Sequence, residues 1–134
     1  MKVKVTIERG DDGSYHAHFS NKKMPFGLIG EGNTAANAIN DFYQSLKDMS
    51  EYYEETGKAF PKGVEYEFRY DLPSFLQYYA YAFTLAGLER ITGVHQKQLG
   101  HYISGIRKPS EATIRKIEER IHAFGNEISS VSFV

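Results

Sequence analysis

The chain contains 134 residues, of which 41% are hydrophobic and 25% charged, a composition typical of a globular protein. No apolar run approaches the roughly 18 residues of a membrane span, so we expect no contact with a membrane. The absence of cysteine excludes disulfides and thiolate metal sites, and it agrees with the reducing cytoplasm in which we expect the protein to act.

The formal net charge of −1 hides an asymmetry between the two halves of the chain. Residues 1–71 contain 9 Lys and Arg against 12 Asp and Glu, whereas residues 72–134 contain 7 against 5. The cationic excess is greatest over residues 95–116, where five basic residues stand against Glu111 alone. Such a surplus is what phosphate binding needs, while the acidic half is better suited to a basic protein partner.

The periodicity of the first half predicts the element order β-β-β-α-β. Apolar and polar side chains alternate over residues 3–8, which predicts a strand with one buried face. A turn signal at 11–13 and renewed alternation over 15–19 predict its hairpin partner. Residues 26–30 predict a third, short strand.

A helix and a fourth strand follow. Asn33 or Thr34 is the expected N-cap, and apolar residues recur at i, i+3 and i+4 spacing over residues 35–53. Residues 64–70 alternate again and predict the fourth strand.

Potential metal ligands in this half have simpler explanations. Asp11 and Asp12 stand beside a glycine and are expected to form a turn. His16 and His18 share one face of a strand, but no third ligand is held near them by spacing, so we expect surface histidines and no metal site. A cross-strand charge ladder is expected between two lysines and two glutamates, Lys2 and Lys4 with Glu65 and Glu67.

The segment Leu72-Pro73-Ser74 is the expected boundary between two domains, 1–71 and 72–134, with Ser74 as the cap of the next helix. The second domain is predicted to be all-helical, with segments at 75–83, 85–92, 96–103 and 110–123. Its tail, Val131 to Phe133, alternates and could form a short strand that pairs across a dimer axis.

Residues 93–109 have the pattern of a DNA-binding helix-turn-helix. Gly93 can supply the positive φ that a tight turn between two helices needs. Val94, Leu99 and Tyr102 are spaced so that one face of the second helix packs on the first. A plain helical bundle with a basic face is the alternative interpretation.

The outer face of the second helix carries side chains that can contact base edges in a major groove. The expected base contacts are Gln96, Lys97, Gln98 and His101. Cations in the following loop and helix are better placed for phosphates, which fix register without reading sequence. The expected phosphate contacts are Arg107, Lys108 and Arg115.

Residues 84–125 resemble the helix-turn-helix of the phage-repressor (Xre) class. The matching positions are Leu88, Gly93, Val94, Gln96, Leu99, Tyr102, Gly105, Lys108-Pro109 and Thr113. Glu89 departs from that pattern, because it stands where these proteins usually carry a small alanine. Either the crossing of the two helices is adjusted, or the carboxylate swings out and pairs with Arg90 or a neighbour.

The first half, with Gly30-Glu31-Gly32-Asn33-Thr34 leading into an alanine-rich helix start, resembles the HicB antitoxin family. The resemblance implies an α+β chain: a truncated ribonuclease-H-like domain over 1–71, then a helix-turn-helix domain over 72–134. Residues 21–24 depart from the family, because they lack its common Pro-Asp-x-Pro-Gly-Cys-like run. No strand presents the carboxylates of a two-metal nuclease, so we expect no enzymatic activity.

What the resemblance implies is an antitoxin that neutralises a HicA-like, mRNA-cleaving toxin and represses its own operon by binding operator DNA as a homodimer or higher homo-oligomer. No cofactor is implied, and the residues that contact the toxin are not indicated by the sequence. The alternative is a transcription regulator whose N-terminal domain senses a ligand or only dimerises.

Overall fold

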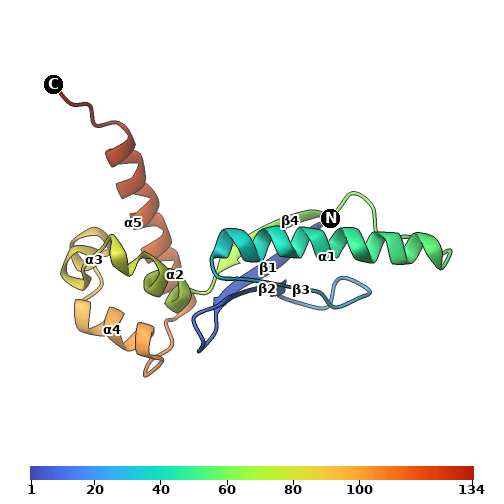
Figure 1. Cartoon of the computed structure of the whole chain (residues 1–134). Coiled ribbons are helices and arrows are strands. Elements are labelled where there is room, and N and C mark those ends of the chain that lie inside the picture. The colour runs from blue at the N-terminus through green and yellow to red at the C-terminus, as the bar shows by residue number, and fades with distance from the viewer. The chain divides into compact units, whose positions relative to one another are not determined.

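The computed structural model describes all 134 residues and divides the chain into two compact units, Met1–Asp71 and Leu72–Val134. The first unit contains a four-stranded sheet and one long helix, and the second is helical (Figure 1). The α+β class is therefore as predicted. No helix has both the length and the apolar character that crossing a membrane requires.

The first unit has the predicted order of elements. They are β1 (Lys2–Arg9), β2 (Tyr15–Phe19), β3 (Ile29–Gly32), α1 (Ala35–Glu55) and β4 (Glu65–Tyr70). The strand order in the sheet is β3-β2-β1-β4, with β1 antiparallel to β2 and parallel to β4. Of the two candidate caps, Thr34 begins α1, because its hydroxyl accepts a hydrogen bond from Asn37 N at 3.0 Å.

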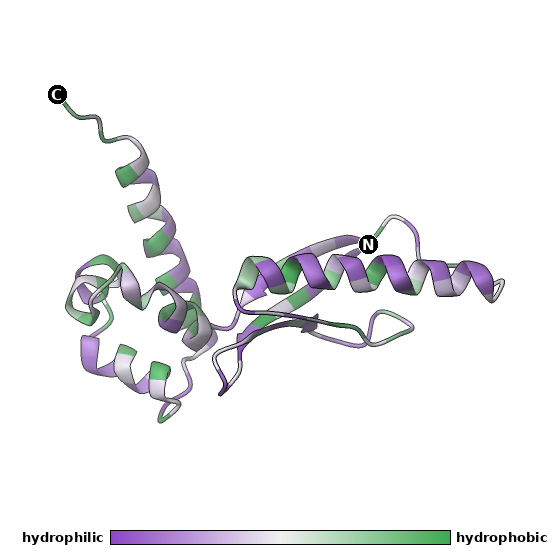
Figure 2. Cartoon of the chain, viewed as in Figure 1, coloured by the Kyte–Doolittle hydropathy of each residue, from purple (hydrophilic) through white to green (hydrophobic).

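One face of the sheet is covered by α1, whose hydrophilic and hydrophobic segments alternate along its length (Figure 2). Phe42 of α1 is fully buried and meets the rings of Phe19, Tyr66 and Phe68 edge-on, at centroid distances of 5.4, 5.8 and 5.6 Å. Because these three rings come from β2 and β4, one side chain of α1 connects the helix to the two strands that flank β1.

The other face of the sheet is polar. The register sets Lys2 beside Glu65 and Lys4 beside Glu67, so the charge ladder expected from the sequence is present. Arg69 also donates to Glu67 at 2.6 Å, and this hydrogen bond lowers the pKa of the Glu67 carboxyl.

The two strand histidines each pair with a glutamate on this polar face. His16 lies 3.5 Å from Glu31, and His18 lies 3.1 Å from Glu8. Nowhere in the structure do His, Asp or Glu side chains gather in a group of three or more that could hold a metal ion.

The third strand begins later than the sequence predicts. It runs from Ile29 to Gly32, whereas the alternation indicated residues 26–30. Pairing with β2 sets these limits, because β2 is only five residues long and matches Tyr15 with Gly32 and His18 with Ile29. Residues 26–28 belong to the preceding loop.

The outer edge of β3 is partly closed by α1. The Glu31 N–H donates to the Asp41 carboxylate at 2.8 Å, so a side chain takes the backbone donor that a further strand would need.

The backbone of α1 also passes directly over β3, and Gly30 makes this approach possible. A Cβ at Gly30 would overlap the Ala38 carbonyl oxygen and the Phe42 amide nitrogen, both of which are backbone atoms.

The second unit consists of α2 (Leu72–Tyr78), a short 3-10 turn η1 (Tyr79–Tyr81), α3 (Leu85–Thr92), α4 (Gln96–Ser104) and α5 (Glu111–Ser129). One core joins α2, α3, α4 and α5. Its buried members are Leu76, Leu88, Val94, Leu99, Tyr102 and Ile117.

Three boundaries in this unit differ from the predictions. The first helix starts at Leu72, because Pro73 is tolerated in the first turn of a helix, and it ends at Tyr78. Ser74 is therefore a buried helical residue and not the cap. The last helix continues to Ser129 instead of ending at 123. Residues 131–134 have no regular structure in the single chain, so the strand predicted there is absent from it.

We expect Gly30→Ala to lower the free energy of unfolding by about 3 kcal/mol, because overpacking against a backbone cannot be relieved by a rotamer change. Urea denaturation followed by far-UV circular dichroism measures the loss. Gly27→Ala is the matched control, since nothing lies within 4 Å of a Cβ at that position. Equal stability of the two variants would contradict the close approach of α1 to β3.

Candidate nucleic-acid interface

The turn between α3 and α4 is held by side chains as well as by backbone. Gly93 adopts φ 73°, and its N–H donates to the Glu89 carbonyl at 2.8 Å. Thr92 is fully buried; its hydroxyl donates to the Leu88 carbonyl at 2.7 Å and accepts from Val94 N at 3.2 Å. The path of the chain from α3 into α4 is therefore closely determined.

Glu89, the residue that departs from the helix-turn-helix pattern, caps α4. Its carboxylate accepts a hydrogen bond of 2.8 Å from the backbone N–H of Gln96, the first residue of that helix. It also lies 3.8 Å from His95 Nε2. Of the alternatives that the sequence left open, the carboxylate pairs with a neighbour across the turn, where the helix dipole favours a negative charge.

A second side chain completes this cap. His95 Nδ1 accepts from Lys97 N at 3.1 Å, so two of the unpaired N–H groups at the start of α4 are taken within the chain. These two N–H groups are therefore not available to a phosphate.

The four predicted base-contact residues do not have the same surroundings. Gln96 and Lys97 are exposed, and His101 lies half-buried one turn after Lys97 on the same side of the helix. Gln98 is half-buried, and its amide nitrogen donates to the hydroxyl of Tyr102. The side chain of Gln98 is therefore engaged in holding a core residue.

Leu99 and Tyr102 fix which face of α4 is turned outward. Both are buried, with exposed fractions of 0% and 2%, in the core shared with α2, α3 and α5. At 100° per residue, Lys97 lies about 160° from Leu99 and about 140° from Tyr102 around the helix axis, and His101 lies about 160° and about 100° from them. The inward positions are those that the spacing predicts.

The loop after α4 brings the predicted phosphate contacts to the surface. Gly105 ends the helix at φ 79°, and Arg107 N donates to the carbonyl of His101 at 3.2 Å, which ties the loop back to α4. The side chains of Arg107 and Lys108 are exposed, as is Arg115 in α5. None of these three forms a salt bridge with a carboxylate.

The first unit offers two further surfaces that the motifs found in the sequence do not include. One is the outer face of the second half of α1, where four carboxylates and one lysine are all exposed: Lys47, Asp48, Glu51, Glu54 and Glu55. Tyr43 and Tyr52 of the same helix are also exposed. The signal was present in the sequence as a local charge of −3 between residues 47 and 55, outside the apolar stripe.

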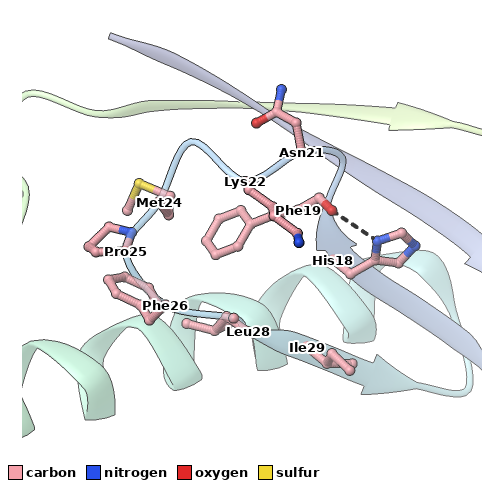
Figure 3. Close-up of a pocket in the computed structure, with 10 residues that line it drawn as sticks. His18, Phe19, Asn21, Lys22, Met24, Pro25, Phe26, Leu28 and Ile29 are labelled. Atoms are coloured by element: carbon pink, nitrogen blue, oxygen red, sulfur yellow. Dashed lines mark hydrogen bonds between the residues drawn. The ribbon is translucent and has the colours of Figure 1, made fainter.

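The second surface is a hollow of about 760 Å³ beneath the loop between β2 and β3. Figure 3 shows Phe19 facing Met24 and Phe26 across it, while His18 Nδ1 donates to the Phe19 carbonyl oxygen at 3.2 Å. Most of the lining is apolar, and Lys22 brings a charge to its rim.

Comparison of the chain with models of protein families, with curated proteins and with solved structures found no match in any of the three.

We expect Glu89→Ala to destabilise the protein by about 1 kcal/mol, the usual cost of losing a helix cap. Thermal or urea unfolding measures it. Glu89→Gln keeps an acceptor for Gln96 N and should recover part of the loss. Glu118→Ala removes an exposed carboxylate from the middle of α5 and serves as the control; if it costs as much as Glu89→Ala, the capping role is wrong.

Proposed function

We propose that the protein is a HicB-like antitoxin that represses its own operon: the second unit binds operator DNA, and the first binds a small, basic, HicA-like mRNA-cleaving toxin. The observation that carries the proposal is α4, a capped helix that exposes Lys97 on its outer side and is followed by a loop with two unpaired cations. In this proposal neither unit performs catalysis, and the protein acts in the cytoplasm.

The dimensions of α4 suit a recognition helix of the helix-turn-helix kind. An α-helix with its side chains is about 10–12 Å across, and the major groove of B-DNA is about 12 Å wide, so α4 with its exposed outer side can enter the groove. Lys97 can donate to guanine O6 and N7, and Gln96 can pair with adenine. His101, one turn further on, is the third candidate for base contact.

Arg107 and Lys108 are assigned to the phosphates on either side of the groove, with Arg115 as a third cation. Because Glu89 and His95 already occupy backbone donors at the start of α4, these side chains supply the positive charge that fixes register. A lone helix-turn-helix makes few base contacts, so we expect a homodimer that reads two half-sites about one helical turn apart.

The acidic face of α1 is the surface we assign to the toxin. A ribonuclease that binds mRNA must present cations to phosphates. The exposed carboxylates Asp48, Glu51, Glu54 and Glu55 offer the complementary charge, and opposite charges speed encounter and fix orientation. Tyr43 and Tyr52 add aromatic side chains of the kind enriched in interfaces.

A transcription regulator with a ligand-sensing first unit is the second candidate, and the hollow in Figure 3 is the observation that favours it. Its volume of about 760 Å³ is within the usual range for small-molecule sites, and its lining is mainly apolar. A small basic protein encoded beside this gene would favour the antitoxin; no such gene would favour the regulator.

We expect Lys97→Ala and Gln96→Ala each to reduce the preference for operator over a mismatched duplex by about 1–3 kcal/mol, the value of one good bidentate contact. Lys108→Ala should weaken all sequences alike and reduce the salt dependence of log K by about one. Fluorescence anisotropy with the DNA upstream of the gene measures both.

The control for these DNA variants is Lys62→Ala, which removes an exposed lysine from the first unit and should change neither quantity. If neither the Gln96 nor the Lys97 variant affects binding, the register assigned to the recognition helix is wrong.

Co-expression of the full chain with the neighbouring basic protein should rescue growth, and the two should copurify. We expect the double variant Glu51→Lys/Glu54→Lys to weaken the complex about tenfold, because it places like charges in the interface. Glu118→Lys/Glu119→Lys makes the same change in charge on α5 and should leave copurification intact. Equal effects of the two would remove α1 as the toxin surface.

A further inference from the structure

The two edges of the sheet differ in how their outward backbone groups are used. At β3, the Asp41 carboxylate accepts from the Glu31 N–H. The edge on the other side of the sheet is β4, whose register with β1 continues over its whole length without a bulge or a proline. Bulges and prolines are among the means by which proteins keep an edge strand from pairing. The β4 edge is therefore the one at which the sheet can accept another strand.

The register of β4 shows which of its backbone groups face outward. Glu65 N donates to the Met1 carbonyl at 2.9 Å, so Glu65 and every second residue after it pair with β1. The backbone N–H and C=O groups of Tyr66 and Phe68 therefore point away from β1. No hydrogen bond within the chain engages these four groups.

The helix-facing side of this edge is apolar and only partly covered. Tyr66 and Phe68 are half-buried, whereas Val3 and Val5 of β1, on the same side of the sheet, are 0% exposed. Tyr43 of α1 is 48% exposed, and its ring centroid lies 5.6 Å from that of Phe68. The apolar layer between the sheet and α1 thus reaches the edge of β4 and remains open there.

On the open face of the sheet, the charges next to the edge are two carboxylates and one paired cation. Glu65 is exposed and forms no salt bridge, and Arg69 lies 2.6 Å from Glu67. Lys2 and Lys4 stand on β1, which is two strand spacings, or about 10 Å, from the position of an added strand. That distance exceeds the Debye length of about 8 Å at physiological salt, so the nearer charges dominate.

The side of α1 that faces β4 adds to the negative charge. From Tyr43, which contacts β4, a row of exposed residues continues along this side of the helix at spacings of four, four and three: Lys47, Glu51 and Glu54. Together with the charges on β4, the edge carries four carboxylates against two cations. The complementary partner is cationic.

We propose that the outer edge of β4 binds an extended, cationic segment of a partner protein, which adds to the sheet as a further strand. Its backbone pairs with Tyr66 and Phe68, its alternate apolar side chains cover the aromatic rings, and the cationic side chains between them lie beside Glu65 and Glu67. In strand addition the main chain supplies affinity and the alternate side chains supply specificity.

This inference deepens the proposed function, in which the segment belongs to the toxin. Its test uses a synthetic peptide and needs neither toxin nor DNA, so that the two proposals can fail separately.

The first experiment is amide hydrogen exchange, followed by NMR, on the full chain with a short peptide in which Lys and Val alternate. The amides of Tyr66 and Phe68 should exchange rapidly in the free protein and at least tenfold more slowly with the peptide, because both donors become paired. A peptide in which Glu and Val alternate has the same backbone and is the control. Fluorescence anisotropy should show that it binds at least tenfold more weakly.

The second experiment separates backbone pairing from side-chain contact. Phe68→Ala removes the ring alone, whereas Phe68→Pro removes the ring and the outward N–H, a change that edge strands tolerate. We expect Phe68→Ala to weaken the Lys-Val peptide severalfold and Phe68→Pro to abolish its binding. Circular dichroism checks that both variants fold.

A charge variant tests the edge independently of these two. Glu65→Lys should weaken the Lys-Val peptide and strengthen the Glu-Val peptide, each at least threefold. Glu118→Lys makes the same change in charge on α5 and should alter neither.

Unchanged exchange of the Tyr66 and Phe68 amides at the highest soluble peptide concentration would overturn the proposal. Equal binding of the two peptides would also overturn it, because the edge would then not select a cationic strand. Protection of the two amides without peptide, increasing with protein concentration, would overturn it in favour of pairing between the β4 strands of two copies.

Discussion

The hydrogen bond from Gln96 N to the Glu89 carboxylate is the contact on which the candidate interface depends. It joins the body of α3 to the first residue of α4 across a turn of three residues, and with the buried hydroxyl of Thr92 it leaves that turn one path. Once α4 starts in this place, Leu99 and Tyr102 enter the core and Lys97 is turned to solvent. Stability of the turn and presentation of the outer face are thus consequences of the same cap.

The two units solve different packing problems. In the first, a single helix must cover a four-stranded sheet, and it does so by lying against a glycine at β3 and sending Phe42 between rings from β2 and β4. In the second, short helices share one small core, and capping side chains set their directions. The first unit therefore leaves broad polar surfaces exposed, whereas the second exposes one helix face and a loop.

Local patterns predicted most of the elements, and two of the features they did not give, the start of β3 and the partner of Glu89, have nonlocal causes. The start of β3 depends on how far β2 extends to pair with it. The periodicity of residues 26–30 carries no information about the length of β2. Glu89 departs from the helix-turn-helix pattern, but its partner is seven residues away across a turn whose geometry only the fold supplies. The hydrogen bond from Gln98 to Tyr102 had a local signal in the sequence, because Tyr102 stands four residues later on the same side of the helix, within reach of the amide. The alternation of Val131 and Phe133 suggested a strand and obscured the apolar spacing that carries α5 to Ser129.

The contact between Asp41 and the Glu31 N–H bears on how the edge of the sheet is protected from other chains. An edge strand with free backbone donors is a template on which other chains can stack into aggregates, and β3 is such an edge. By occupying the donor from the side of α1, the carboxylate denies incoming strands one of the bonds they would need first. A strand that adds to the sheet at that border would first have to displace the carboxylate.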